Sequence, residues 1–158
     1  DLVIQPTSKH LIVGTHGRSL YKADIAPLQL LTDELSQKDF HVFEITNIRK
    51  SSNWGRSWSQ WRAASTPEIK LPFFTSSKRK VTIDIFSDTI KVNSISVTAD
   101  RGFNEAMYDV SFSRKGKEAY EKANKKAGLE KAKNDVYYLP KGKYTVKIGN
   151  SQSEFEVK

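Results

Sequence analysis

The chain has no cysteine and a single methionine among its 158 residues. The lack of cysteine excludes disulfide bonds, thiolate metal ligands and cysteine nucleophiles. No run approaches the roughly 20 apolar residues that a membrane-spanning helix needs. Phosphate-cradling glycine loops and dinucleotide fingerprints are absent as well. From these absences we expect no disulfide, no membrane span and no cofactor.

Acidic residues are in the minority. The chain has 26 Lys and Arg against 18 Asp and Glu, a net charge of +8, and most of this excess lies in residues 114–143. A nucleic-acid groove combines basic residues with interleaved aromatics and some arginine. Lysine dominates here, and Tyr120, Tyr137 and Tyr138 are the aromatic residues in the segment. The pattern favours a solvated lysine-rich helix and does not favour a nucleic-acid partner.

Alternation of apolar and polar residues dominates the second half of the chain. It recurs in residues 81–87, 94–98, 106–113, 144–148 and 154–158. A period of two predicts strands with one face in a core and the other in water. Gly149-Asn150 and Pro140-Lys141-Gly142 are typical of the turns between such strands. The sequence therefore predicts an all-β, antiparallel β-sandwich.

Residues 115–133 break the alternation. They are rich in Ala, Lys and Glu, which favour helices. Tyr120, Ala123 and Ala127 share one helical face, and Gly128 interrupts the run. This apolar stripe is thin, so we expect a surface helix inserted between two strands at the edge of the sandwich.

The first 25 residues show a different pattern. Residues 1–6 and 11–21 predict a pair of strands around a short polar turn. The second of these segments contains a turn motif formed by Gly14, Thr15, His16, Gly17 and Arg18. This pattern resembles the closing repeat of exported β-propellers of the sortilin-like and neuraminidase-repeat type, often labelled glycosyl hydrolases. Because a blade has about four strands and sister blades, we expect residues 1–25 to be the remnant of a last blade, partnered by the propeller of a longer protein.

Residues 67–158 resemble the immunoglobulin-like module that follows many such propellers, akin to a domain of flagellar hook-capping proteins. Two motifs carry the resemblance, and their residues are Asn104, Tyr108, Asp109, Pro140, Gly142 and Tyr144. We expect Asn104 and Asp109 to brace turns and the two tyrosines to fill the core. The family usually has Trp at Tyr108 and a shorter loop at the lysine-rich segment. The resemblance implies a periplasmic, cell-surface or secreted protein.

Residues 26–66 are expected to connect blade and sandwich. Thr32 is a candidate N-cap for a short helical turn through Leu35, and residues 40–44 predict a strand. The segment from Ser51 to Trp58 fits the spacing of the Asp box, S-x-D-x-G-x-T-W, of sialidase-type propellers. That motif braces a hairpin and performs no chemistry, and chance also accounts for the match.

Three tryptophans fall within eight residues of this connector, interleaved with two arginines. The cluster consists of Trp54, Arg56, Trp58, Trp61 and Arg62. Exposed aromatic rings with Arg and Asn bind sugars. The same composition is typical of a protein interface, and the rings also suit a core position. Glycan binding, contact with the propeller and self-association of the chain all remain open.

Catalytic patterns are sparse. His10, His16 and His41 lack metal-site spacing, and His16 beside Ser19 has no third orienting group. Two Asp pairs, Asp84 with Asp88 and Asp100 with Asp109, have a simpler role as surface and turn acids. We therefore expect no metal site and no catalytic residue in this chain, whether or not a longer parent protein is a glycoside hydrolase.

Two functions follow from these observations. The leading one is a non-catalytic accessory module of an exported β-propeller protein, which seals the propeller and mediates protein or surface contacts. The alternative is a carbohydrate-binding module that targets an associated glycosidase through Trp54, Trp58 and Trp61.

Overall fold

The computed structural model describes residues 1–17, 19–29, 31–59, 61–125 and 128–158. The chain forms two compact units, residues 1–38 and residues 39–158, and each is described by itself. Arg18 of the turn motif and Ala127 of the expected helical face lie outside the described residues.

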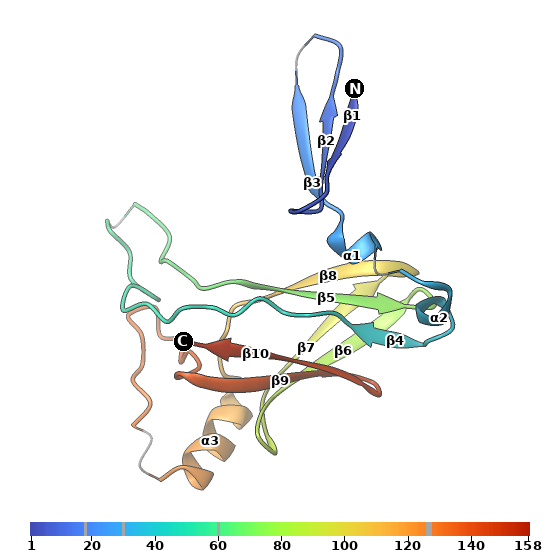
Figure 1. The fold of residues 1–158 in the computed structure, drawn as a ribbon. Coiled ribbons are helices and arrows are strands. Elements are labelled where there is room, and N and C mark those ends of the chain that lie inside the picture. Colours follow the sequence, from blue (N-terminus) through green and yellow to red (C-terminus); the bar gives the residue numbers. More distant parts are fainter. Residues whose placement is uncertain (18, 30, 60, 126–127) are drawn as a thin grey trace. The chain divides into compact units, whose positions relative to one another are not determined.

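The second unit is a sandwich of two antiparallel sheets (Figure 1). One sheet has the order β4-β5-β8, with strands Phe40–Val42, Ile69–Thr75 and Gly102–Tyr108. The other has the order β10-β9-β6-β7, with strands Ser151–Val157, Gly142–Ile148, Arg79–Ser87 and Ile90–Ala99. In chain order from β4, the first, second and fifth strands (β4, β5 and β8) form one sheet. The third, sixth and seventh strands (β6, β9 and β10) form the other sheet, and the fourth, β7, joins it by pairing with β6. This division differs from that of immunoglobulin constant domains in the fourth strand, which there joins the first, second and fifth. The predicted all-β sandwich is confirmed.

Period-two alternation builds the core between the sheets. Val81, Ile83 and Ile85 of β6 are buried, and they face the buried Leu71 and Phe73 of β5. Burying each such side chain contributes about 1.5–3 kcal/mol. The largest fully buried side chains are Tyr108 and Tyr144.

The strand expected over residues 106–113 ends earlier, at Tyr108. Val110 has a φ of 58°, which breaks the extended backbone. Ser111 then forms an isolated bridge with Tyr138. Val110 and Phe112 are still buried, so the alternation of apolar residues indicated burial correctly and the strand end wrongly.

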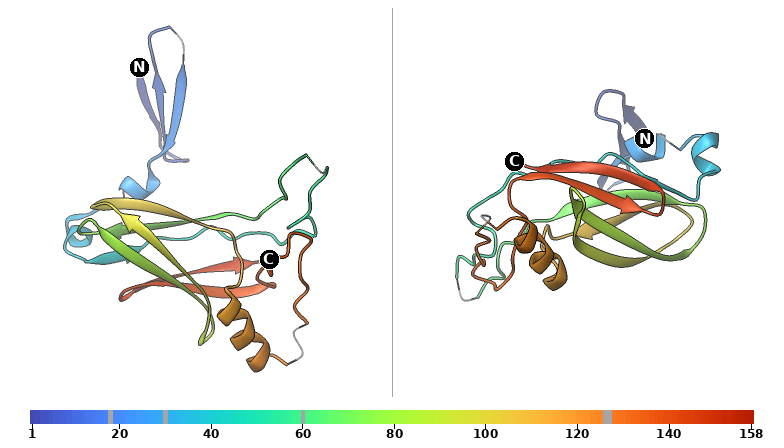
Figure 2. Two further views of the ribbon diagram at one scale, coloured as in Figure 1. Left: turned by 180° about the vertical axis from the view of Figure 1, so that it is seen from behind. Right: turned by 90° about the horizontal axis from the view of Figure 1, so that it is seen from below.

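The helix α3 spans Arg114–Ala123 and packs on β7 (Figure 2). Ser113 caps it, because its Oγ accepts a hydrogen bond from the Gly116 backbone N–H at 3.0 Å. A Cβ at Gly116 would lie 1.9 Å from the carbonyl oxygen of Val92, so only glycine permits this approach. The Tyr120 ring meets that of Phe112 with centroids 5.2 Å apart.

The helix expected over residues 115–133 is therefore too long. Asn124 leaves helical geometry, with φ −116° and ψ 66°, and its Nδ2 donates to the Tyr120 carbonyl. Residues 128–133 are not helical. Helix propensity favoured the whole segment, but the cap at Asn124 and the tertiary contacts of residues 129–138 end the helix early.

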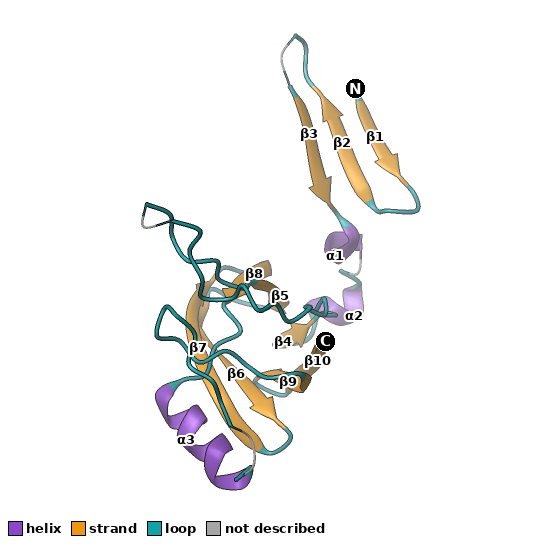
Figure 3. Cartoon of the chain, turned by 90° about the vertical axis from the view of Figure 1, so that its left-hand side faces the viewer, coloured by secondary structure: helices purple, strands orange, loops and turns teal. Residues whose placement is uncertain are grey.

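The first unit contains a three-stranded antiparallel sheet, β1-β2-β3, followed by two short helical turns (Figure 3). The strands are Leu2–Gln5, His10–Gly14 and Leu20–Asp24, and the turns are α1, Ala26–Gln29, and α2, Asp33–Ser36. Residues 11–21, expected as one strand, contain a turn in which Thr15 donates from its N–H and Oγ1 to the Ser19 carbonyl. The predicted cap is confirmed, since Thr32 Oγ1 accepts from the Leu35 N–H.

Much of the segment expected as a connector lies in the second unit. Its strand β4 pairs with β5, and Phe43 donates its N–H to the Pro72 carbonyl. Ile48 forms a parallel bridge with Val157. Residues 39–50 therefore run along the sandwich before the tryptophan-rich segment begins.

Candidate functional site: a tryptophan loop and a basic cleft

The tryptophan-rich segment forms a loop with a narrow neck, which we call the tryptophan loop, residues 51–65. At the neck, Gly55 N–H donates to the Ser65 carbonyl at 2.7 Å, and Ser65 N–H donates to the Arg56 carbonyl at 2.8 Å. Ser57 Oγ lies within hydrogen-bond distance of the carbonyls of Ser59 and Arg62. The loop is thus braced by its own serines.

The segment with Asp-box spacing does not pack as that motif does in propellers. Ser51 Oγ accepts a hydrogen bond from the Asn53 N–H, so the segment does turn. Trp58, however, is 87% exposed instead of packed between strands. The segment lies in the sandwich unit and acts as a local turn.

The three tryptophans lie in different environments. Trp58 and Trp61 are each 87% exposed. Trp54 is half-buried, and its ring meets that of Tyr138 edge-on, with centroids 5.7 Å apart. Arg62 is exposed on the same loop. Trp54 thus packs against the core, as the core interpretation expects, whereas Trp58 and Trp61 are exposed.

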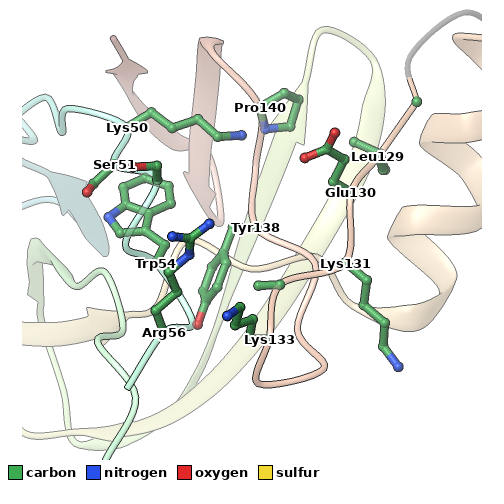
Figure 4. A pocket seen from close by; sticks show the side chains of 13 residues that line it. Lys50, Ser51, Trp54, Arg56, Leu129, Glu130, Lys131, Lys133, Tyr138 and Pro140 are labelled. Carbon is green, nitrogen blue, oxygen red and sulfur yellow. The ribbon is translucent and has the colours of Figure 1, made fainter. Parts of the chain in front are cut away.

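Trp54 and Arg56 line one wall of a cleft of about 300 Å³ (Figure 4). The opposite wall comes from the chain that leads from α3 to β9, residues 128–140. We call this cavity the basic cleft. Its lining includes Lys50, Ser51, Trp54, Arg56, Glu130, Lys131, Lys133 and Tyr138.

The two walls are held in close contact. Gly55 has a φ of 76°, and a Cβ there would lie 2.4 Å from Asn134 Oδ1 and 2.6 Å from the Ala132 Cβ. Asn134 Nδ2 in turn donates to the Tyr138 hydroxyl at 2.7 Å. The far wall is folded by a hydrogen bond from Ala132 N–H to the Val136 carbonyl. Glycine at position 55 therefore permits the approach that forms the cleft.

The cleft is electropositive. Lys50 donates from Nζ to the Leu139 carbonyl at 3.4 Å. Burial lowers the pKa of Lys50, the negative charge of Glu130 acts in the opposite direction, and the positive charge of Lys141 lowers the pKa further. Lys131 points away from the cavity, and its Nζ pairs with Asp135 at 2.6 Å (Figure 4). Lys50, Arg56 and Lys133 therefore supply the positive charge of the cleft.

The residues of the two sandwich motifs make structural contacts. Asn104 Oδ1 accepts from the Asp100 N–H at 2.9 Å, and Asn104 Nδ2 donates to the Asp100 and Gly102 carbonyls. Asp109 Oδ1 accepts hydrogen bonds from the N–H and the Oγ of Ser111. These contacts brace the two ends of β8.

The hydroxyls of the two core tyrosines reach main-chain carbonyls. Tyr108 donates to the Ser111 carbonyl, and Tyr144 donates to the Pro140 carbonyl at 2.8 Å. Gly142 begins β9, two residues before Tyr144. The tyrosines thus fill the core and satisfy their polar ends within it.

The turn-motif residues of the first unit lie at the ends of its strands. Gly14 N–H donates to the Asp1 carbonyl at 2.9 Å, which closes one end of the sheet. His16 is exposed in the turn, and Gly17 has a φ of 99°. Such a φ is favourable for glycine and strained for most other residues.

The carboxylates considered for catalysis are engaged in other contacts. Asp84 accepts from Lys91 Nζ at 2.8 Å and from Ser94 Oγ at 2.6 Å. Burial alone would raise the pKa of Asp84, but these hydrogen bonds and the Lys91 charge hold it below its usual value. Asp100 pairs with Lys78 at 2.9 Å. An acid with a lowered pKa is poorly suited to donate a proton near neutral pH.

Within the described ranges, no three His, Cys, Asp or Glu side chains gather as a metal site would require. In that same part of the chain, none of the helices has the length and apolar character to cross a membrane. No family model, curated protein or solved structure matches the chain.

Proposed function

We propose that the chain is a non-catalytic accessory module of an exported, glycosyl hydrolase-like β-propeller protein. In this proposal the sheet of the first unit completes a propeller blade, and the sandwich mediates protein or surface contacts. The observation that carries the proposal is that large apolar side chains are exposed on both faces of the sheet β1-β2-β3.

The strand register assigns residues to each face. Leu2 lies opposite Val13, which lies opposite Tyr21, so these three side chains share one face. Val3, Ile12 and Leu20 lie on the other face. This face is mixed, because it also carries the polar residues Gln5, His10 and Lys22. Leu2 is 68% exposed and Leu20 is 80% exposed.

A sheet that exposes large apolar side chains on both faces gains stability from cover on both faces. A sheet of a sandwich has one apolar face, whereas a propeller blade packs between two neighbouring blades. Burying a side chain such as Leu20 would contribute about 1.5–3 kcal/mol. The exposed apolar side chains on both faces thus favour the blade assignment over an independent domain.

Cysteine labelling tests this proposal, because the 158 residues contain no cysteine of their own. The variants Leu20→Cys and Tyr21→Cys place a thiol on opposite faces of the sheet, and Gln152→Cys, at an exposed position of β10, is the control. In the 158-residue chain all three thiols should react rapidly with a maleimide. In the longer propeller polypeptide, the first two should be protected and the third should not.

Equal reactivity in both polypeptides would contradict the blade assignment. Protection that grows with the concentration of the 158-residue chain would indicate self-association instead.

A second candidate function is carbohydrate binding, which the exposure of Trp58 and Trp61 favours. Exposed indole faces pack against the C–H surfaces of sugars. If this function holds, a glycan ligand should protect Trp58 and Trp61 from iodide quenching, and Trp58→Ala with Trp61→Ala should abolish binding on a glycan array. Quenching that no glycan changes would exclude it.

A further inference from the structure

Within the described part of the chain, two positively charged side chains of the basic cleft lack an acidic partner. Among the described residues, neither Arg56 nor Lys133 forms an ion pair, whereas Lys131 is paired with Asp135. Lys50 is partly withdrawn from water, which lowers its pKa. An anion beside these side chains would offset the cost of keeping three positive charges together.

The other residues that line the cleft limit the chemical classes of ligand that it suits. Trp54 and Tyr138 supply aromatic surface, and Ser51 and Ser52 supply hydroxyls. Glu130, which also lines the cleft (Figure 4), would repel a highly charged anion but accepts hydrogen bonds from neutral hydroxyls. The combination suits a molecule that carries an anionic group, hydroxyl donors and an apolar face.

Size argues against an inorganic anion as the only ligand. The cleft holds about 300 Å³, and a water molecule in the liquid occupies about 30 Å³. A single small ion would leave most of the cleft and its aromatic surface uncovered. A volume of this size lies at the lower end of typical pockets for organic ligands.

We propose that the basic cleft binds an acidic saccharide. Its carboxylate or sulfate groups contact the three cations, and its C–H face covers Trp54. Glu130 and the serine hydroxyls accept hydrogen bonds from its hydroxyl groups. The cleft lies wholly within residues 39–158, so this proposal does not depend on the propeller assignment.

Trp54 is a natural reporter of binding. The protein for the experiment carries Trp58→Phe and Trp61→Phe, which removes the two exposed tryptophans and leaves Trp54 as the single indole. Its fluorescence is titrated with trigalacturonic acid, with a sulfated galactose trisaccharide, with neutral galactotriose and with inorganic sulfate. Comparison of the two acidic trisaccharides shows whether the cleft binds a carboxylated or a sulfated saccharide.

One or both acidic trisaccharides should change the fluorescence of Trp54 saturably, while galactotriose and sulfate should not. Rising salt should weaken this binding, because the contacts are ionic and partly exposed. Arg56→Gln and Lys133→Gln should each weaken it about tenfold, as expected for the loss of a charge-assisted hydrogen bond.

Lys122→Gln is the control. It removes the same charge at an exposed position of α3 that does not line the cleft. Circular dichroism and melting curves check that each variant folds.

Three results would overturn the proposal. The first is the absence of binding by either acidic trisaccharide. The second is equal weakening by Lys122→Gln and Lys133→Gln, which would indicate nonspecific attraction to net charge. The third is sulfate binding as tight as trisaccharide binding, which would indicate a simple anion site.

Discussion

Tyr144 lies near the start of β9 and donates its hydroxyl to the carbonyl of Pro140, four residues upstream. This is the arrangement of the tyrosine corner in immunoglobulin-like sandwiches. Burial raises the pKa of Tyr144 above its usual value, so the hydroxyl stays protonated and remains a donor. A single side chain thus ties the chain that leads from α3 to the sheet.

Tyr144→Phe should lower the free energy of unfolding by about 1 kcal/mol, the usual contribution of one hydrogen bond. Urea denaturation followed by circular dichroism measures it. Tyr21→Phe is the control, because Tyr21 is 60% exposed on the other unit. Equal effects of the two substitutions would contradict the assigned role of the hydroxyl.

The titration of Asp84 should make the free energy of unfolding depend on pH. Its folded pKa lies below its usual value of 3.8, because the hydrogen bonds from Lys91 and Ser94 and the Lys91 charge outweigh burial, which acts in the opposite direction. Its stabilising contribution is therefore complete above about pH 5 and is lost as the pH falls through the folded pKa.

Asp84→Asn should lower the free energy of unfolding at pH 7 by at most about 1 kcal/mol, since Lys91 is half exposed. The difference between variant and wild type should shrink toward pH 2. Denaturation curves between pH 2 and pH 7 measure it, and a constant difference over this range would contradict the assignment.

Among the elements, α3 depends on a close approach to β7 at Gly116. An added Cβ would lie 1.9 Å from the Val92 carbonyl oxygen, and backbone cannot move aside as a flexible side chain does. Gly116→Ala should therefore destabilise the protein by about 2 kcal/mol or more, although alanine has the higher helix propensity.

Gly128→Ala is the matched control, because nothing lies within 4 Å of a Cβ at that position. It should change the free energy of unfolding by less than about 0.5 kcal/mol. Thermal melts compare the two variants. A stabilised Gly116→Ala would show that the helix does not pack against β7 as described.

Sequence patterns predicted strands and helix caps correctly where neighbouring residues alone determine the structure. The alternation at residues 81–87 located β6, and the Thr32 cap was predicted because its spacing to Leu35 is fixed by helix geometry. The end of α3 was missed, because high helix propensity continues past Asn124 while tertiary contacts do not. The same limit applies at Val110, where a positive φ ends the strand within a run of alternating residues.

The basic cleft could not be predicted from sequence, because its walls lie far apart along the chain. Trp54 and Arg56 were candidates on composition, and Lys133 belonged to a segment expected to be a solvated helix. The contact of Gly55 with Asn134 and Ala132 brings them together. An isolated glycine within a tryptophan-rich segment was the available signal, and it does not identify the partner segment.

At the scale of the whole molecule, the two units differ in how well they are buried. Every residue of the main hydrophobic core lies between Val42 and Val157. The sheet of the first unit has exposed apolar residues on both faces, among them Leu2, Val3 and Leu20. The sandwich therefore carries its own core, and the first sheet does not.

Removal of residues 1–38 should leave the sandwich folded, with a melting midpoint within about 4 °C of the full chain. It should also reduce binding of the dye ANS, because the exposed apolar residues of β1 and β3 are removed. Differential scanning calorimetry and dye fluorescence measure the two effects. A truncated chain that fails to fold would contradict the independence of the core.

The most direct test of the blade assignment is hydrogen–deuterium exchange of the sheet formed by residues 2–24. In the 158-residue chain, its amides should exchange quickly, since three strands without cover on either face are marginally stable. In a longer polypeptide that contains the proposed propeller, the same peptides should be strongly protected, while peptides from β5 and β6 exchange equally slowly in both. Equally fast exchange of residues 2–24 in the two polypeptides would contradict the account.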